Sequence, residues 1–316
     1  MNEGRFGIWL IGAWGRLATA TATGLACLQQ HLPDIGGLVS DLPQFANLNL
    51  ADWECFVLGG HEIRRTSYRV EARSLLATSH FLDAERLEKI SFILAAFDKN
   101  IRTGTLVNVG SDIESRATAA TLKTRGETPR SAIERITADL REFGTSHSLE
   151  HVIVVNVAST EPTTAVEETD ISWAELVDVL NQADQAPVPA STLYAAAAMQ
   201  AGFTYFNFAA SLGSDLPPFS ELAAITGTLH MGSDGETGES PLTSLRAPLW
   251  GECDPVRGAA SILDLARFGE RERRRGKSGL MTFLSSFFKR PMGSETDDLR
   301  EPLARLDAWA DDVSRE

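Results

Sequence analysis

The chain has 316 residues, enough for one or two domains, and its 43% hydrophobic and 23% charged residues are ordinary for a globular protein. A formal net charge of −14 argues against nucleic acid or an anionic membrane as a partner. The three cysteines form no C-x-x-C pair, and no apolar run has the length of a spanning helix or the pattern of a signal peptide. We therefore expect a cytoplasmic protein with reduced thiols and without a membrane partner.

The N-terminal region is predicted to form a strand over residues 6–11, a glycine turn over residues 12–18 and then a helix over residues 19–28. The turn reads Gly12-x-x-Gly15-x-x-Ala18, a loose form of the dinucleotide-binding pattern G-x-G-x-x-G. Gly12 permits a tight turn, Gly15 lets a pyrophosphate approach, and Ala18 is small enough for close helix–strand packing. Two interpretations remain open, because an ordinary turn without a ligand has the same pattern as a phosphate site at a helix N-terminus.

Further strands and helices alternate along the first half of the chain. Residues 36–40 read as a short second strand and residues 56–63 as a third strand that ends in a loop. Residues 69–99 and 130–143 have helical spacing of apolar side chains. Residues 152–157 form a β-branched apolar run, which is typical of a strand buried on both faces of a parallel sheet.

The second half continues the alternation. Helices are predicted over residues 172–183 and 190–201, a strand over 204–208, and a strand over 229–231 that leads into a polar loop. This order predicts an α/β fold, a Rossmann-like doubly wound parallel sheet.

The last part of the chain has a different character. Residues 261–268 are predicted to be helical, residues 270–277 to be a solvated helix end and turn, and residues 280–289 to be amphipathic. We expect the Rossmann-like domain to span residues 1–248, and residues 249–316 to form a helical segment that packs back on it.

Seven sequence blocks, in this order and spacing, resemble the myo-inositol-1-phosphate synthases, also called inositol-3-phosphate synthases, and most closely a bacterial branch of that family. The resemblance covers nearly all of this chain. The blocks are Trp9-Leu10-Ile11-Gly12-Ala13, Gly59 to Ser67, Val154 to Pro162, Asn207-Phe208 with Ser211-Leu212-Gly213, Gly232 to Glu239, Ile262 to Arg267 and Phe287 to Gly293.

The resemblance implies an isomerase that converts glucose 6-phosphate to 1D-myo-inositol 3-phosphate in a redox-neutral cyclisation, a step of inositol and phospholipid biosynthesis. NAD would be the cofactor, regenerated within the cycle, and a sugar phosphate the small-molecule partner. The family also implies a homo-oligomer, a tetramer in its members. In such a reaction the protein must orient the cofactor, move protons and stabilise an enolate and a phosphate.

The family's functional residues carry over only where this chain matches. Glu62 stands where the family usually has Asp and would bind the adenosine ribose. Asp234 would face nicotinamide and substrate, and Lys289 would lie in the substrate site, so these two are the predicted catalytic residues. The predicted cofactor-binding residues are Gly12, Ala13, Gly15, Glu62, Ala158, Ser159 and Thr160.

The chain also departs from the family. Glu236 stands where the family loop usually has Lys, and the lysine-rich blocks that would fall between Leu249 and Trp250 are absent. A reduced second domain, with its catalytic and oligomer-forming regions shortened, is therefore expected. A second hypothesis follows: a degenerate NAD-binding module without synthase turnover, because the missing lysines would have stabilised charge in the transition state.

Each candidate residue also has a structural interpretation. Lys289 resembles a cation at a helix C-terminus, and Asp234 lies in what could be an ordinary polar surface loop. His61 and His230 follow strands, where a histidine is either an acid–base group or a structural hydrogen-bonding residue. No His, Cys, Asp and Glu cluster has metal-ligand spacing, so we expect no protein-built metal site.

Overall fold

A single sheet of seven parallel strands organises the fold, in the order β3-β2-β1-β4-β5-β6-β7. The computed structural model describes residues 4–33, 37–76, 82–162, 171–182, 186–237, 254–294, 298 and 300–316. The strands are β1 (Phe6–Ile11), β2 (Phe56–Glu62), β3 (Ile101–Thr103), β4 (His151–Asn156), β5 (Thr204–Asn207), β6 (Leu229–Gly232) and β7 (Gly279–Leu280). The strand order reverses between β1 and β4, which confirms the predicted doubly wound α/β fold.

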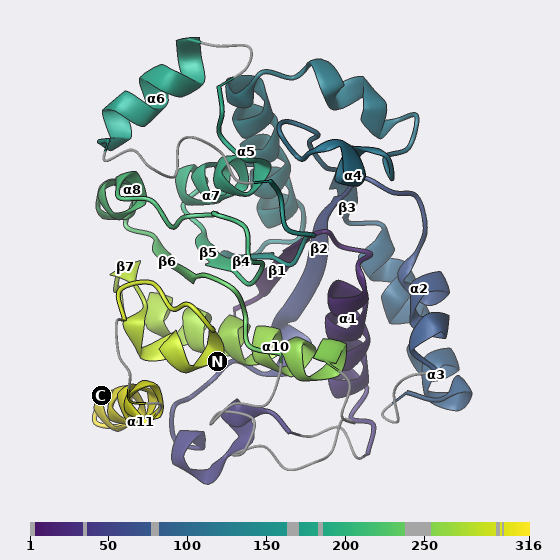
Figure 1. Ribbon diagram of the computed structural model, residues 1–316. Helices are drawn as coiled ribbons and strands as arrows, with labels where there is room; N and C mark the ends of the chain where they lie inside the picture. Colours follow the sequence, from purple (N-terminus) through teal and green to yellow (C-terminus); the bar gives the residue numbers. More distant parts are fainter. Residues whose placement is uncertain are drawn as a thin grey trace.

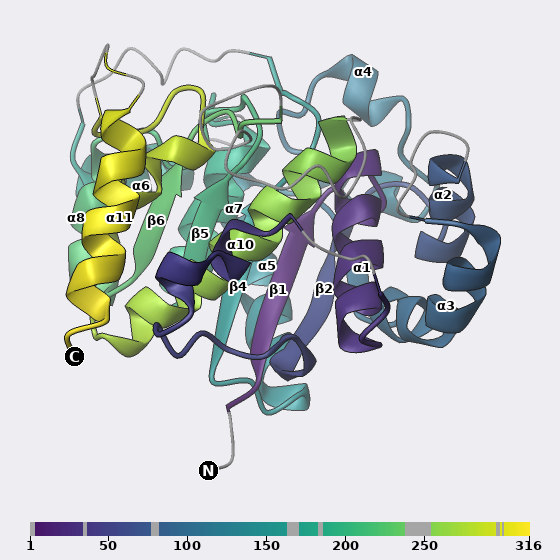
Figure 2. The ribbon, with the colours of Figure 1, turned by 90° about the horizontal axis from the view of Figure 1, so that it is seen from below.

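Helices cover both faces of this sheet (Figure 1). One face is covered chiefly by α1 (Arg16–Gln29) and α10 (Asp254–Arg274), which cross in front of the strands in Figure 2. The other elements on this side are α2 (Tyr68–Leu75), α3 (Ala84–Asp98) and α11 (Glu301–Val313). On the opposite side lie α4 (Ser111–Glu114), α5 (Pro129–Ser146), α6 (Trp173–Gln182), α7 (Ala190–Gln200) and α8 (Pro218–Thr226). No helix in the described ranges is both long and apolar enough to cross a membrane.

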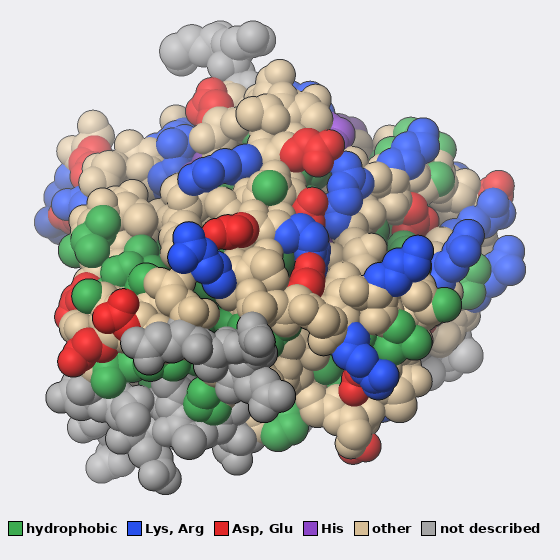
Figure 3. All heavy atoms as spheres, turned by 90° about the horizontal axis from the view of Figure 1, so that it is seen from above, with side chains coloured by type: hydrophobic (Ala, Val, Ile, Leu, Met, Phe, Trp, Pro, Cys, Tyr) green, Lys and Arg blue, Asp and Glu red, His purple; other side chains and the backbone are tan. Residues whose placement is uncertain are grey.

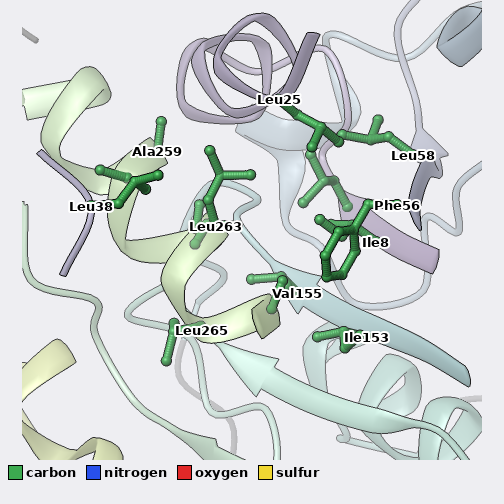
Figure 4. Packing of buried hydrophobic residues seen from close by; sticks show 14 of the residues in the cluster. Ile8, Leu25, Leu38, Phe56, Leu58, Ile153, Val155, Ala259, Leu263 and Leu265 are labelled. Carbon is green, nitrogen blue, oxygen red and sulfur yellow. The ribbon is translucent and has the colours of Figure 1, made fainter. Parts of the chain in front are cut away.

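The central strands are buried on both faces because each contributes apolar side chains to two cores. In β1, Ile8 and Leu10 face the core under α1 and α10, whereas Trp9 and Ile11 face the core under α5 and α7. Figure 4 shows Ile8, Phe56, Ile153 and Val155 on the first side, with Leu25 of α1 and Leu263 of α10 above them. This two-sided burial explains why these strands are continuous apolar runs that sequence alone identifies.

The predicted strand over residues 36–40 is wrong in the part that the structure describes. Val39 to Asp41 instead form a turn of 3₁₀ helix, and residues 34–36 lie outside the described ranges. Asp264 of α10 explains the difference: its buried carboxylate accepts hydrogen bonds from the backbone N–H groups of Val39 and Ser40, both at 2.9 Å. These N–H groups therefore have acceptors without a neighbouring strand.

Two arginines of α10 contact the later part of the segment that connects α1 to β2. Arg267 donates to the carbonyl of Ala51 and lies over the Trp53 ring, 4.5 Å from its centroid. Arg271 donates to the carbonyl of Leu48 at 2.8 Å. One helix thus supplies the acceptors and donors that order a connection far away in the sequence.

The predicted solvated charge run over residues 270–277 is also wrong in part. Helix α10 ends at Arg274, as expected, but Glu270 is fully buried and Glu272 is only 8% exposed. Glu272 accepts a hydrogen bond from the Trp309 indole of α11 at 2.8 Å and one from Arg275. Glu272 thus links α11 to the end of α10, whereas Glu270 pairs with Arg274 of its own helix. The amphipathic segment over residues 280–289 becomes β7 and a 3₁₀ helix over Thr282–Phe287.

The residues after 254 pack directly on the Rossmann-like sheet. Helix α10 lies against α1, and β7 extends the sheet beside β6. The expected boundary at residue 248 lies outside the described ranges, so the division into residues 1–248 and 249–316 remains a prediction.

Replacing Asp264 tests the role of α10 in ordering the connection after α1. Asp264→Ala leaves two buried N–H groups without an acceptor, and we expect it to lower the free energy of unfolding by about 2–4 kcal/mol, as measured by denaturant titration. Asp264→Asn keeps one oxygen acceptor, so it should lower the free energy of unfolding by less than Asp264→Ala. The matched control is Asp307→Ala on the exposed side of α11, which should change the free energy by about 0.5 kcal/mol or less. Equal losses in D264A and D307A would contradict this role.

Candidate functional site

A cleft of about 380 Å³ lies at the carboxyl ends of the strands, at the point where the strand order reverses. Ligands of doubly wound sheets bind at this position. The cleft is bounded by the turn after β1, the ends of β2 and β4, and the start of α7. The predicted cofactor residues Gly12, Gly15, Glu62, Ala158 and Ser159 all line it. Of the other two, Ala13 is fully buried in the core and Thr160 is exposed outside the lining.

The turn after β1 depends on Gly12. Its φ of +81° lies in the left-handed region, and a Cβ atom there would be 2.9 Å from the Cα of Ala158. The N–H groups of Gly12 and Ala13 both donate to the carbonyl of His61 at the end of β2, at 2.9 and 3.1 Å. The turn is therefore held between β2 and β4, and only glycine fits at its first position.

The N-terminus of α1 is open toward the cleft. The N–H group of Thr19 donates to the carbonyl of Gly15, and no side chain caps the helix. In the described part of the chain, the N–H groups of Arg16, Leu17 and Ala18 have no acceptor. Arg16 also lines the cleft, and the first turn of α1 contains no acidic residue. Free amides, the helix dipole and a guanidinium together fit the two phosphates of a dinucleotide.

Glu62, the last residue of β2, is almost completely engaged by the protein itself. Its Oε2 atom accepts from the N–H of Trp14 in the glycine turn at 2.9 Å and from Arg64 at 3.1 Å. Its Oε1 atom accepts from the N–H groups of Ile63 and Arg64, at 2.8 and 3.0 Å. A ribose hydroxyl could reach this carboxylate in place of the Arg64 side chain, which is one-third exposed. Glu62 thus orders the phosphate turn as well as facing the cleft.

Beyond β4, the chain turns over the other side of the cleft. The buried amide of Asn156 accepts from the N–H of Ala158 at 3.2 Å and donates to Asn207 of β5 at 3.0 Å. This fixes Ala158 and Ser159 beside the glycine turn.

Glu161 also lines the cleft, although no sequence motif points to a role for it. Its carboxylate oxygens accept from the N–H of Ser191 in the first turn of α7, at 2.9 and 3.1 Å, and its own N–H donates to Ser211. Burial raises the pKa of this carboxyl to about 7. Its position after the apolar strand β4 indicates that it lies near the cleft. Its burial could not be predicted, because it depends on packing against α7, which is distant in the sequence.

The two candidate histidines are buried, and their side chains form hydrogen bonds inside the protein. His61 accepts from the Trp9 indole at 2.9 Å through Nδ1, so its Nε2 carries the proton and donates to Asp139 at 3.0 Å. Burial lowers the pKa of His61, which keeps the ring neutral. His230 of β6 contacts the Ser214 hydroxyl at 3.1 Å, and its pKa falls to about 4 because it is buried.

The structure brings the two predicted catalytic residues together, but outside the lining of the cleft. Lys289 Nζ lies 3.7 Å from Asp234, and Arg290 lies 3.8 Å from the same carboxylate. The backbone N–H of Lys289 also donates to the carbonyl of Asp234 at 2.7 Å. This cluster follows β6, at the same carboxyl edge of the sheet as the cleft. Residues 238–253, which follow the Asp234 loop, lie outside the described ranges.

The side of the molecule formed by α4, α5 and α6 carries no broad basic patch among the described residues (Figure 3). Figure 3 shows Lys and Arg side chains intermixed with Asp and Glu side chains over that face. In the described residues, no group of three or more His, Cys, Asp or Glu side chains is placed to hold a metal ion.

An NAD-binding family model described as myo-inositol-1-phosphate synthase matches residues 40–311 of this chain. The chain belongs to the myo-inositol-1-phosphate synthase family. This finding confirms the resemblance seen in the sequence and the prediction of NAD as cofactor. The open N-terminus of α1 and the glycine turn, which a Cβ atom at Gly12 would disrupt, fit that cofactor.

Individual relatives are distant. Inositol-3-phosphate synthase 1 of Bacteroides thetaiotaomicron is 24% identical over 261 residues, which is 78% of this chain. The chain spans only 58% of the length of that relative. An inositol-3-phosphate synthase structure from Caenorhabditis elegans matches 99% of this chain and 86% of its own, with a TM-score of 0.77 and 15% identity. A myo-inositol-1-phosphate synthase-related protein from Thermotoga maritima matches 97% of this chain and 98% of its own, with a TM-score of 0.65 and 15% identity. These structures share the fold.

Gly12→Ala tests the turn that carries the cofactor site. Its Cβ would clash with Ala158 at a positive φ, so we expect NAD affinity to fall at least about tenfold and the free energy of unfolding to fall by about 1–3 kcal/mol. Calorimetry and denaturant titration measure the two effects. Gly126→Ala is the matched control, because a Cβ there meets no atom within 4 Å. NAD binding in G12A equal to that in G126A would overturn this assignment.

The buried His230 predicts a specific pH dependence of stability. Its pKa drops from 6.5 to about 4 on folding, so below pH 6.5 the unfolded chain binds the proton more readily and stability falls as the pH falls. His230→Gln removes this loss. The free energy of unfolding of the variant minus that of wild type should rise by about 2–3 kcal/mol from pH 8 to pH 4.5. At pH 8 this difference reports only the cost of changed packing. A difference that does not change with pH would contradict the prediction.

Proposed function

We propose that this chain is an NAD-dependent homologue of the inositol-3-phosphate synthases that acts as an isomerase on a sugar phosphate, converting glucose 6-phosphate to 1D-myo-inositol 3-phosphate. The observation that carries the proposal is the open N-terminus of α1 in a cleft where the strand order reverses. There Arg16 and the free amides of α1 would bind the pyrophosphate, and Glu62 would meet the adenosine ribose. NAD would supply reversible hydride transfer, so the cyclisation would need no external oxidant.

Lys289 is the residue proposed to meet the substrate phosphate or a developing negative charge. Its side chain is 44% exposed and lies beside Asp234 at the carboxyl edge of the sheet. Inositol and phospholipid biosynthesis is the proposed context. A cytoplasmic location and a homo-oligomer remain predictions.

A second candidate, an NAD-binding module without turnover, is favoured by the charges around Asp234. This carboxylate lies between Lys289 and Arg290, so the three groups have a net charge of only about +1. A phosphate monoester carries about −1.5 to −2 at neutral pH. Glu236 adds a further acidic residue to the same loop, where the family usually has Lys. The cofactor cleft does not share this weakness, because its phosphate site consists of backbone amides and Arg16.

Two measurements separate these candidates. Calorimetry measures NAD binding, and chromatographic separation measures the inositol phosphate formed from glucose 6-phosphate with NAD, because substrate and product are isomers of equal mass. Binding with turnover supports the synthase. Binding without turnover leaves the module, and absence of NAD binding overturns both.

Lys289→Ala tests the proposed chemical role. Removing one positioned cation from the transition state should lower turnover by about 10²–10³-fold while NAD affinity stays unchanged, because Lys289 does not line the cleft. Lys277→Ala is the matched control, since Lys277 is an exposed lysine near the opposite edge of the strands. A variant K289A as active as K277A would remove Lys289 from the mechanism.

A further inference from the structure

Glu161 is a partly buried carboxyl group that lines the cofactor cleft, without a cationic partner among its described contacts. Its hydrogen-bond partners are the N–H of Ser191 at the carboxylate and Ser211 at its own N–H. The helix dipole of α7 favours its ionised form, and its removal from water opposes it. Because burial is the larger effect, its pKa rises to about 7. At neutral pH this carboxyl group is therefore partly protonated.

The position of Glu161 relates it to one half of a bound dinucleotide. Glu62 ends β2, on one side of β1, whereas Glu161 follows β4, on the other side. A dinucleotide crosses a doubly wound sheet at this reversal, with its pyrophosphate at the N-terminus of α1. If the adenosine lies on the side of Glu62, as the proposed function holds, the nicotinamide lies on the side of Glu161.

The nicotinamide ring is cationic in the oxidised dinucleotide and neutral in the reduced one. A cation brought into a water-poor cleft stabilises a nearby carboxylate and lowers its pKa, while a neutral ring only adds desolvation. The two redox states should thus have opposite effects on a carboxyl group that is half protonated.

We propose that Glu161 is the residue by which this cleft favours the oxidised over the reduced dinucleotide: it releases its proton to solvent when the cationic ring binds and retains it when the neutral ring binds. The inference rests on the proposed NAD site but not on synthase turnover.

The other groups near Glu161 do not replace it in this role. Tyr194 and Tyr205 interact with its charge, and burial raises the pKa of both phenols far above neutral pH, so they stay protonated. Among the described residues, the other charged groups that line the cleft are Arg16, Glu62, Arg64 and Arg116, together with the neutral His61.

Calorimetry in buffers of different ionisation enthalpy tests the proposal on the wild-type protein. At pH 7 we expect NAD⁺ to release up to about half a proton on binding, because the group is about half protonated there. NADH and ADP-ribose, which lacks the ring, should release none. NAD⁺ affinity should rise by up to about tenfold from pH 6 to pH 8, while NADH affinity does not rise. Equal proton release with all three ligands would overturn the proposal.

Glu161→Gln keeps an oxygen acceptor for Ser191 but cannot ionise. We expect E161Q to abolish the proton release and the pH dependence of NAD⁺ binding, and to reduce the preference for NAD⁺ over NADH. The matched control is Asp112→Asn, an exposed carboxylate on α4, which should behave as wild type. Persistent proton release in E161Q would show that another group is responsible. If no dinucleotide binds to wild type, the proposed function fails first, so the two failures are distinguishable.

Discussion

The functional site depends on one carbonyl group, that of His61 at the end of β2. It accepts from the N–H groups of both Gly12 and Ala13 and so fixes the path of the chain between β1 and α1. The left-handed conformation of Gly12 and its close approach to Ala158 complete the constraint from the side of β4. With the turn held from both neighbouring strands, the first amides of α1 are directed into the cleft and remain available to a ligand.

Four further hydrogen bonds make this arrangement rigid. Glu62 holds the N–H of Trp14, and the Trp14 indole donates to Asp98 at the end of α3 at 2.8 Å. His61 is itself locked between Trp9 and Asp139. The carbonyl of a residue whose side chain is fixed on both ring nitrogens cannot move far, so the glycine turn and the first amides of α1 are held in place before a ligand arrives. Preorganisation of this kind reduces the entropy that binding must overcome.

Much of the fold could be predicted from sequence because its strands are buried on both faces. The runs at β1, β2 and β4 are apolar for that reason, and the glycine turn stands between a strand and a helix that are both easily identified. The errors have a common cause. Residues 39–41 became a turn because Asp264 satisfies their N–H groups across 225 and 224 positions of sequence, and Glu270 is buried by neighbours that no local pattern reveals. The short strand β3, three residues long and only partly buried, had no such signal.

The site residues divide in the same way. Gly12, Gly15 and Ala158 could be placed at the cleft because small residues are needed at such a turn, whereas the protonation of Glu161 depends on the N-terminus of α7 and on burial. The proposed function has two requirements, cofactor binding and catalysis, and they depend on different groups. Binding a dinucleotide requires backbone amides and a tight turn, and both are present in this chain. Stabilising charge on a reacting sugar phosphate requires several cations, and Lys289 and Arg290 share theirs with Asp234. Removal of cations near Asp234 would therefore affect the proposed turnover without disturbing the backbone amides at the N-terminus of α1.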